Sequence, residues 1–251
     1  MYLIKYFLSC LYRVWFYLLM ITVVLLLSPF LFFTIWSEKT YPAFFALARV
    51  WAKLTFYGMG MRLDIKQKQT YQKGRSYIFI ANHTSMLDIM LILILVKDNP
   101  FVFVGKQELA KIPIFGFFYK KTCILVNRGD AKSRFHVFES AQERLQAGFS
   151  ICIFPEGGVP DDLSILLDRF KDGAFRIAID HQIPIAPMSF GKLKFFFPFV
   201  WGKGYPGTVP VIQHEIIDTL GKTANQRKEL SNLAYTLIAQ PLADWEKEEK
   251  A

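Results

Sequence analysis

The sequence predicts an α/β fold: a mixed, largely parallel sheet flanked by helices, with an N-terminal membrane-associated helical segment. Short apolar runs with the composition of strands recur from about residue 61 onward, and helix-like stretches separate them. Strands that alternate with helices are typical of a sheet that helices cover on both faces. The N-terminal segment is expected because a long uncharged run precedes the first strand-like run.

The N-terminal residues combine an apolar run with an amphipathic stretch. Residues 14–36 carry no charge, and the run is long enough to cross a bilayer with some tilt. Pro29 lies within it, so a re-entrant or interfacial hairpin is the alternative to a single span. In residues 40–60, apolar residues recur at helical spacing, with Arg49 and Lys53 between them. This pattern predicts a helix that lies at the lipid headgroups or packs on the domain.

The composition favours a lipid partner over nucleic acid. The chain is 53% hydrophobic, contains 25 Phe and has a formal net charge of +9. A basic protein suits nucleic acid, anionic lipid or a phosphorylated substrate, and the apolar N-terminal residues decide for lipid. Three cysteines without CxxC spacing suggest neither a disulfide framework nor a zinc site. A reducing, cytosol-facing location is the simplest interpretation.

From residue 61 the chain alternates between two kinds of segment. The apolar, strand-like runs are 77–81, 101–105, 123–126, 150–154 and 183–190. The helix-like stretches are 85–96, 107–119, 131–147 and 164–181, and the tail 222–251 predicts a final, polar-rich amphipathic helix. In such sheets, functional groups collect just beyond the carboxyl ends of the strands. Polar residues that follow the strand-like runs are therefore the candidates for a functional site.

His83 and Asp88 lie just after the first of these runs, in the sequence ANHTSMLDIM. The spacing of Ser85 and Asp88 is that of a helix-capping pair, and a structural role for each residue is the simpler alternative. If His83 precedes the helix, its ring can fold back over the first turn toward Asp88. A carboxylate on one imidazole nitrogen fixes the tautomer and raises the basicity of the other nitrogen. The pair then predicts a general base that needs no protein nucleophile.

A second candidate follows the strand-like run 150–154, in the sequence FPEGG. The turn places Glu156 at a strand end, beside backbone amides that Gly157 and Gly158 are expected to leave accessible. Glycine turns are common, so this motif has little weight by itself.

Together, NHTSMLD at 82–88 and FPEGG at 154–158 resemble the glycerophospholipid acyltransferase family, and most closely its 1-acylglycerol-3-phosphate acyltransferase branch. That family carries an N-H-x-x-x-x-D motif and an F-P-E-G motif about this far apart. GKQELAKIPIFG (105–116) with CILVNRGD (123–130) is similar to its second motif, and IPIAPMSF (183–190) to its fourth. The resemblance covers roughly residues 75–190.

The resemblance implies transfer of a fatty acyl group from acyl-CoA or acyl-carrier protein to a lysophospholipid hydroxyl, without a further cofactor. His83 would accept the hydroxyl proton, and Asp88 would orient His83. Lys106 and nearby amides would stabilise the oxyanion. Arg128 would bind the acceptor's phosphate; its alternative role is that of a charged residue on the surface at a strand end. Glu156 would brace Arg128 or bind a glycerol hydroxyl. Residues 1–60 would anchor the enzyme on the membrane, and residues 61–251 would form a catalytic domain facing the cytoplasm.

The sequence departs from the family pattern where the acceptor is expected to bind. The family often continues F-P-E-G-T-R-S, whereas Gly158, Val159 and Pro160 stand here. A basic residue of that motif is thus missing, and Arg169 or Lys171 is the candidate to replace its charge. A lysolipid acceptor without phosphate, such as a lyso-aminolipid, is therefore the alternative to 1-acylglycerol-3-phosphate.

Other classes of protein have less support in the sequence. A serine hydrolase would need a nucleophile, and Ser85 is near His83, but no G-x-S-x-G motif is present. The remaining histidines, His136, His181 and His214, lack the spacing of metal ligands. A non-enzymatic membrane-binding module would keep the N-terminal helices but would not require His83 or Glu156.

Overall fold

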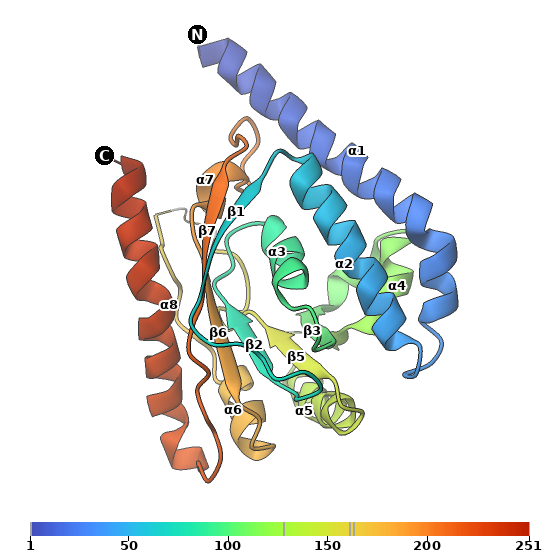
Figure 1. The fold of residues 1–251 in the computed structure, drawn as a ribbon, viewed down its shortest axis with the longest axis vertical. Coiled ribbons are helices and arrows are strands. Elements are labelled where there is room, and N and C mark those ends of the chain that lie inside the picture. Colours follow the sequence, from blue (N-terminus) through green and yellow to red (C-terminus); the bar gives the residue numbers. More distant parts are fainter. Residues whose placement is uncertain (1, 128, 161, 163, 251) are drawn as a thin grey trace.

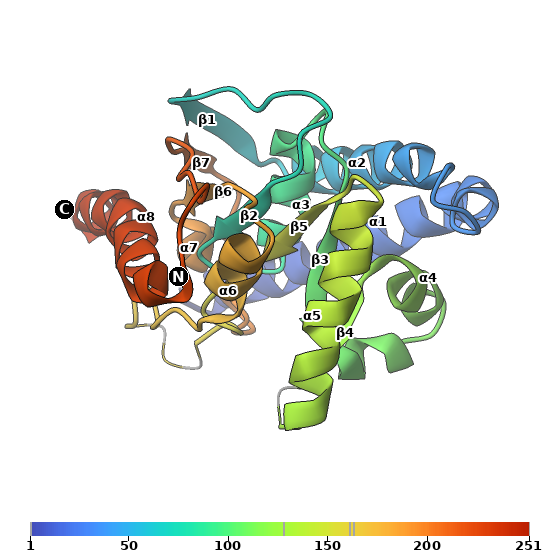
Figure 2. The ribbon, with the colours of Figure 1, turned by 90° about the horizontal axis from the view of Figure 1, so that it is seen from below.

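A seven-stranded sheet forms the centre of the chain in a computed structural model, which describes residues 2–127, 129–160, 162 and 164–250. The strand order is β1-β7-β6-β2-β5-β3-β4, and every neighbouring pair is parallel except β6 with β7. Helices α5, α6 and α8 cover one face of the sheet, while α3, with α2 and α1 stacked beyond it, covers the other (Figures 1 and 2). The predicted fold class, a largely parallel sheet between helices, is confirmed.

All of the predicted strands are present, with small changes at their ends. They are β2 (Ile78–Ala81), β3 (Phe101–Lys106), β4 (Ile124–Val126), β5 (Ser150–Ile153) and β6 (Ile185–Phe190). Two further strands, β1 (Arg62–Gln67) and β7 (Thr208–Gln213), were not predicted. β1 is one of the two edge strands and is mostly exposed, so its residues lack the continuous apolar character of a buried strand. Its pairing with β7 depends on two segments far apart in the sequence.

The helices largely follow the predicted stretches. They are α1 (Tyr2–Thr34), α2 (Tyr41–Gly58), α3 (Leu87–Leu95), α4 (Phe115–Thr122), α5 (Ala131–Gln146), α6 (Gly173–Asp180), the short α7 (Leu193–Phe196) and α8 (Arg227–Lys250), with 3-10 turns η1 (Gln107–Lys111) and η2 (Ala224–Gln226). The single helix predicted over 107–119 is wrong, because Pro113 and Ile114, whose φ is 63°, separate η1 from α4. The helix predicted over 164–181 is also too long, since regular α-helix begins only at Gly173.

The two N-terminal helices form a hairpin that packs on the domain. α1 is the helix of the described chain that is long and apolar enough to cross a membrane. It turns back through residues 35–40 into α2, and the two lie side by side (Figure 1). α2 lies between α1 and α3 and buries Phe45, Ala52 and Phe56 in the main core. Arg49 donates to the carbonyl of Leu93 at 3.1 Å. α2 thus packs on the domain, the second of the two placements that the sequence left open.

Arg13 fastens the first half of α1 to the segment that follows α7. It is only 2% exposed. Its guanidinium donates to the carbonyls of Pro198 and Val200. The same group lies 4.7 Å from the ring centroid of Phe197 and 5.4 Å from that of Trp201. A charge buried in this way is stabilised by carbonyl dipoles and aromatic faces rather than by a carboxylate.

Replacing Arg13 with Leu is expected to destabilise the protein by about 1–3 kcal/mol, because two buried carbonyls would lose their donor. Thermal unfolding of the full chain in detergent measures the effect. Lys5→Leu is the matched control, since Lys5 lies on the same helix and is exposed. Equal unfolding temperatures for the two variants would show that Arg13 does not hold α1 in place.

Candidate active site

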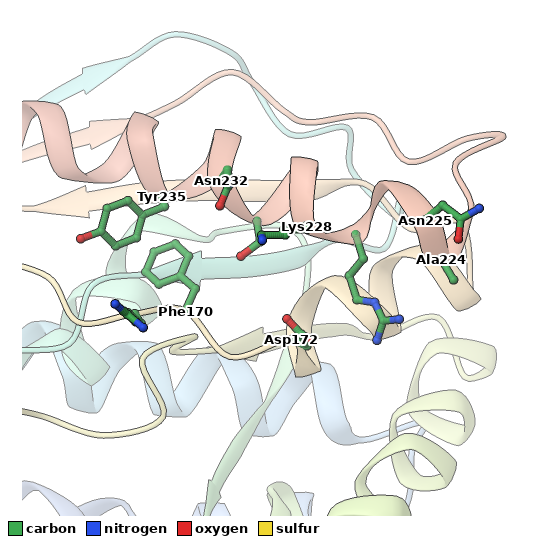
Figure 3. Close-up of a pocket in the computed structure, with 10 residues that line it drawn as sticks. Phe170, Asp172, Ala224, Asn225, Lys228, Asn232 and Tyr235 are labelled. Atoms are coloured by element: carbon green, nitrogen blue, oxygen red, sulfur yellow. The ribbon is translucent and has the colours of Figure 1, made fainter.

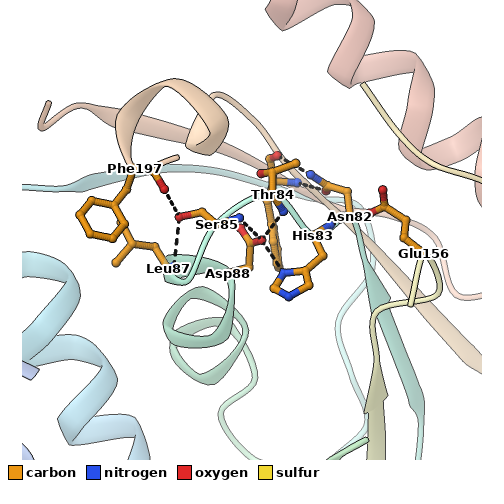
Figure 4. Close-up of polar contacts among 9 residues, drawn as sticks. Asn82, His83, Thr84, Ser85, Leu87, Asp88, Glu156 and Phe197 are labelled. Atoms are coloured by element: carbon orange, nitrogen blue, oxygen red, sulfur yellow. Dashed lines mark hydrogen bonds and ion pairs between the residues drawn. The ribbon is translucent and has the colours of Figure 1, made fainter. Parts of the chain in front are cut away.

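His83 and Asp88 meet at the carboxyl end of β2, where the chain enters α3. His83 Nδ1 lies 2.9 Å from Asp88 Oδ2 (Figure 4). His83 precedes the helix and Asp88 lies in its first turn, so the ring folds back as the sequence predicts. The side chain of His83 is 18% exposed, whereas that of Asp88 is fully buried.

The surroundings of Asp88 decide which imidazole nitrogen can act as a base. Asp88 Oδ2 also accepts hydrogen bonds from the backbone amides of Thr84 at 2.6 Å and Ser85 at 2.8 Å. An oxygen that accepts from two backbone amides acts as an acceptor toward Nδ1 as well, so Nδ1 of His83 carries the proton and Nε2 is the nitrogen that is left to act as a base. The ring stacks on Phe154, with 4.2 Å between centroids, which fixes the direction in which Nε2 points.

Glu156 joins the two sequence motifs. Its Oε1 accepts the backbone amide of His83 at 2.7 Å, and its Oε2 accepts that of Asp168 at 2.8 Å. Burial raises the pKa of Glu156 to about 7; these two hydrogen bonds oppose the shift, and the carboxylates of Asp88 and Asp168 add to it. Glu156 therefore holds the backbone on both sides of the site. Its expected contact with Arg128 lies outside the described residues.

The glycine turn after Glu156 is closed by its own backbone. The amide of Gly157 donates to the carbonyl of Phe154 at 3.0 Å, so it is not the accessible donor that the sequence suggested. Gly157 has a φ of 79°, and a Cβ on it would lie 2.5 Å from Lys171 Nζ. The ammonium group of Lys171 thus lies against this turn. The same chain segment is tied down by the amide of Lys171, which donates to Pro155 at 2.8 Å.

Lys106 lies at the same edge of the sheet but apart from His83. It ends β3, which is separated from β2 by β5, and it is in register with Val126 of β4. Its ammonium is 4.0 Å from Glu108, and its side chain is 53% exposed. Arg128, two residues beyond Val126 in the sequence, lies outside the described residues. The structure therefore brings together His83, Asp88 and Glu156, while the roles of Lys106 and Arg128 stay predictions.

Two supporting residues were not singled out from the sequence. Asn82 exchanges hydrogen bonds with the backbone of Phe190, through Oδ1 at 2.8 Å and Nδ2 at 2.9 Å. It thereby ties the residue before His83 to β6. Asp168 supplies the second amide that Glu156 accepts. Asn82 stands within the quoted motif, but nothing in the local sequence around Asp168 indicates this contact.

Comparison with known proteins agrees with this geometry. A family model described as Acyltransferase matches residues 62–191, more than half of the chain. The chain belongs to the acyltransferase family. The matched range contains the His83–Asp88 pair, Glu156 and the whole sheet except β7.

Relatives within the acyltransferase family extend the match. The chain is 29% identical to human 1-acyl-sn-glycerol-3-phosphate acyltransferase beta over 170 residues, covering 67% of this chain and 60% of the human protein. It is 28% identical to the Escherichia coli 1-acyl-sn-glycerol-3-phosphate acyltransferase over 191 residues, covering 75% and 76%. The crystal structure of the 1-acyl-sn-glycerophosphate (LPA) acyltransferase PlsC from Thermotoga maritima superposes with a TM-score of 0.77 at 25% identity, covering 97% of both chains.

Proposed function

We propose that this protein transfers a fatty acyl group from a thioester donor, acyl-CoA or acyl-carrier protein, to the free hydroxyl of 1-acylglycerol-3-phosphate, which yields phosphatidic acid. The observation that carries the proposal is the 2.9 Å contact between His83 Nδ1 and the buried Asp88 carboxylate, which leaves Nε2 as a free base. The names of the human and Escherichia coli relatives favour this acceptor.

The reaction needs only one proton carrier. Nε2 of His83 takes the proton from the acceptor hydroxyl as its oxygen attacks the thioester carbonyl. Asp88 stabilises the imidazolium that results. When the intermediate collapses, the carbon–sulfur bond breaks, the new ester remains on the acceptor, and the proton passes from Nε2 to the departing thiolate. Lys106, in this proposal, stabilises the negative charge on the carbonyl oxygen once a substrate is bound.

Arg128 and Lys171 are proposed to bind the acceptor's phosphate. Lys171 presents its ammonium group at the Gly157 turn, next to Glu156. This position supports Lys171, rather than Arg169, as the substitute for the basic residue that the motif lacks. A lyso-aminolipid acceptor has no phosphate and would not need two cationic side chains to bind it. An acyl-transfer assay with both kinds of acceptor distinguishes the two substrates.

Arg128→Ala is expected to raise the apparent KM for 1-acylglycerol-3-phosphate by about tenfold or more, since a contact between charged groups is lost. The KM for the acyl donor should stay unchanged. Initial rates with each substrate varied in turn measure both values. Lys121→Ala is the control, because Lys121 is an exposed cation at the end of α4. Equal changes in both KM values would assign Arg128 a structural role instead.

We further propose that α1 and α2 hold the enzyme at the membrane surface without crossing it. α1 touches the domain in its first half, through Arg13, and near its C-terminal end, through Phe32, whose ring stacks on that of Phe117 of α4 with 6.0 Å between centroids. A helix held along one side leaves its opposite face for lipid, as interfacial helices do. That face carries large exposed side chains, including Leu3, Phe7 and Leu26. The catalytic domain would then face the cytoplasm.

The structure gives no support to a serine nucleophile. The hydroxyl of Ser85 is fully buried and donates to the carbonyl of Phe197 at 2.7 Å. It also accepts the amide of Leu87 at 3.2 Å. A nucleophile has to face its substrate and a base, whereas Ser85 is committed to joining α3 to the segment after α7.

The test of the proposed function is an acyl-transfer assay of the purified full chain in detergent. Several lysolipids, with and without phosphate, are offered with either acyl-CoA or acyl-carrier protein as donor. Formation of phosphatidic acid from 1-acylglycerol-3-phosphate is expected. Transfer only to phosphate-free lysolipids would favour the aminolipid alternative, and hydrolysis of the donor without transfer would overturn the proposal.

A further inference from the structure

A groove separate from the His83–Asp88 pair lies between the start of α8 and the segment 169–172 (Figure 3). Its volume is about 670 Å³, which is within the range of sites for small molecules. Phe170 and Tyr235 form an aromatic wall, with 5.1 Å between ring centroids. The groove is therefore large enough, and partly apolar enough, to hold an organic ligand.

The groove is positively charged. Arg169, Arg227 and Lys228 line it together with one carboxylate, that of Asp172. Within the described part of the chain, none of the three cationic side chains has an ion pair or a hydrogen bond, whereas Lys194 of α7 pairs with Glu246 of α8 at 2.6 Å. Guanidinium and ammonium groups without partners, gathered around a cavity, are suited to phosphate groups.

The wall of the groove is continuous with the candidate active site. Arg169 and Lys171 belong to one short segment. At the start of this segment the amide of Asp168 donates to Glu156 Oε2, and at its end the amide of Lys171 donates to the carbonyl of Pro155. Lys171 lies against the Gly157 turn, while Arg169 lines the groove. A ligand that occupied the groove could thus extend along this segment toward His83.

The position of the groove distinguishes a soluble ligand from a membrane lipid. α8 lies on one face of the sheet, and α1 and α2 lie beyond the other (Figures 1 and 2). A headgroup in the bilayer that contacts α1 would not reach this face. The donor, in contrast, arrives from water. Of the two donors, an acidic carrier protein would require an extended basic surface, whereas a concave site with an aromatic wall suits a nucleotide.

We infer that this groove binds the phosphorylated nucleotide end of an acyl-CoA donor, with Arg227 and Lys228 as phosphate ligands. This inference rests on the proposed function for the identity of the ligand. It assigns the protein a donor site that is separate from the acceptor site at Lys171 and Arg128.

Binding of CoA to the full chain in detergent, measured by titration calorimetry, tests the site without depending on turnover. The double variant Arg227→Gln/Lys228→Gln is expected to bind CoA at least about tenfold more weakly, because hydrogen bonds from charged donors to phosphate are lost. Lys247→Gln is the matched control, as Lys247 is an exposed cation near the other end of α8. Unchanged affinity of the double variant, or equal loss in the control, overturns the donor site.

Kinetics separates this inference from the proposed function. The double variant should raise the KM for acyl-CoA but not for the lysolipid. It should transfer normally from an acyl thioester of N-acetylcysteamine, which has no nucleotide. A rise in the KM for acyl-carrier protein alone, without an effect on acyl-CoA, would assign the groove to the protein donor and overturn our inference. Absence of transfer from any donor in the unsubstituted enzyme would instead contradict the proposed function.

Discussion

His83→Ala is expected to lower the turnover number by about 10²–10⁴-fold, which is the usual contribution of a general base. The fold should be retained, because the side chain is 18% exposed and its hydrogen bond is made to Asp88, whose Oδ2 still accepts two backbone amides. Turnover under saturating substrates and thermal unfolding of the same preparation measure the two properties separately.

Asp88→Asn should reduce turnover strongly as well, for a reason of charge rather than geometry. An amide oxygen can occupy the place of Oδ2 and accept the same hydrogen bonds. The new amino group would then take the place of Oδ1, which has no hydrogen-bond partner among the described residues. The imidazolium would lose its counter-charge, while the packing around it would be kept.

A matched pair on the surface supplies the control for both variants. His136 Nδ1 lies 2.6 Å from Glu139 Oε2 on the exposed side of α5, so it repeats the same chemistry away from the site. His136→Ala should retain wild-type turnover. If folded His83→Ala enzyme also turned over at nearly the wild-type rate, His83 would not be the base.

Removal of residues 1–60 is expected to prevent stable folding rather than only to release the enzyme from membranes. Phe45 and Phe56 of α2 are 3% and 0% exposed. Phe45 packs on Phe101 of β3 with 5.0 Å between ring centroids, and Tyr41 donates to the carbonyl of Phe101 at 2.8 Å. Each buried aromatic side chain contributes about 1.5–3 kcal/mol, against a typical net stability of about 5–15 kcal/mol.

A chain that begins at Lys39 separates the two roles of the N-terminal residues. It lacks α1 but keeps α2 and its contacts with α3 and β3. We expect it to fold, to show a cooperative thermal transition, and to sediment less with membranes at high salt than the full chain. If the chain that begins at residue 61 unfolded as cooperatively as this one, α2 would not be part of the core. The division at residue 60 suggested by the sequence stays a prediction that these two chains test.

The central strands could be predicted because the residues of a buried strand are apolar along its whole length. β2 and β5 are covered by helices on both faces, so their residues are apolar almost without interruption. β1 could not be predicted in this way, since an edge strand that is mostly exposed has no such signal. The irregular course of residues 164–172 was missed because its backbone amides bind Glu156 and Pro155 instead of continuing a helix.

The sequence by itself determined the fold class, the acyltransferase motifs and the two strand ends at which His83 and Glu156 stand. Each of these depends on residues close together in the chain. Tertiary structure alone decided that Glu156 holds the backbone of His83, that Lys171 reaches the Gly157 turn, and that Arg13 is buried. These contacts join segments separated by many residues, and a hydrogen bond or ion pair leaves no periodic pattern in the sequence of either partner.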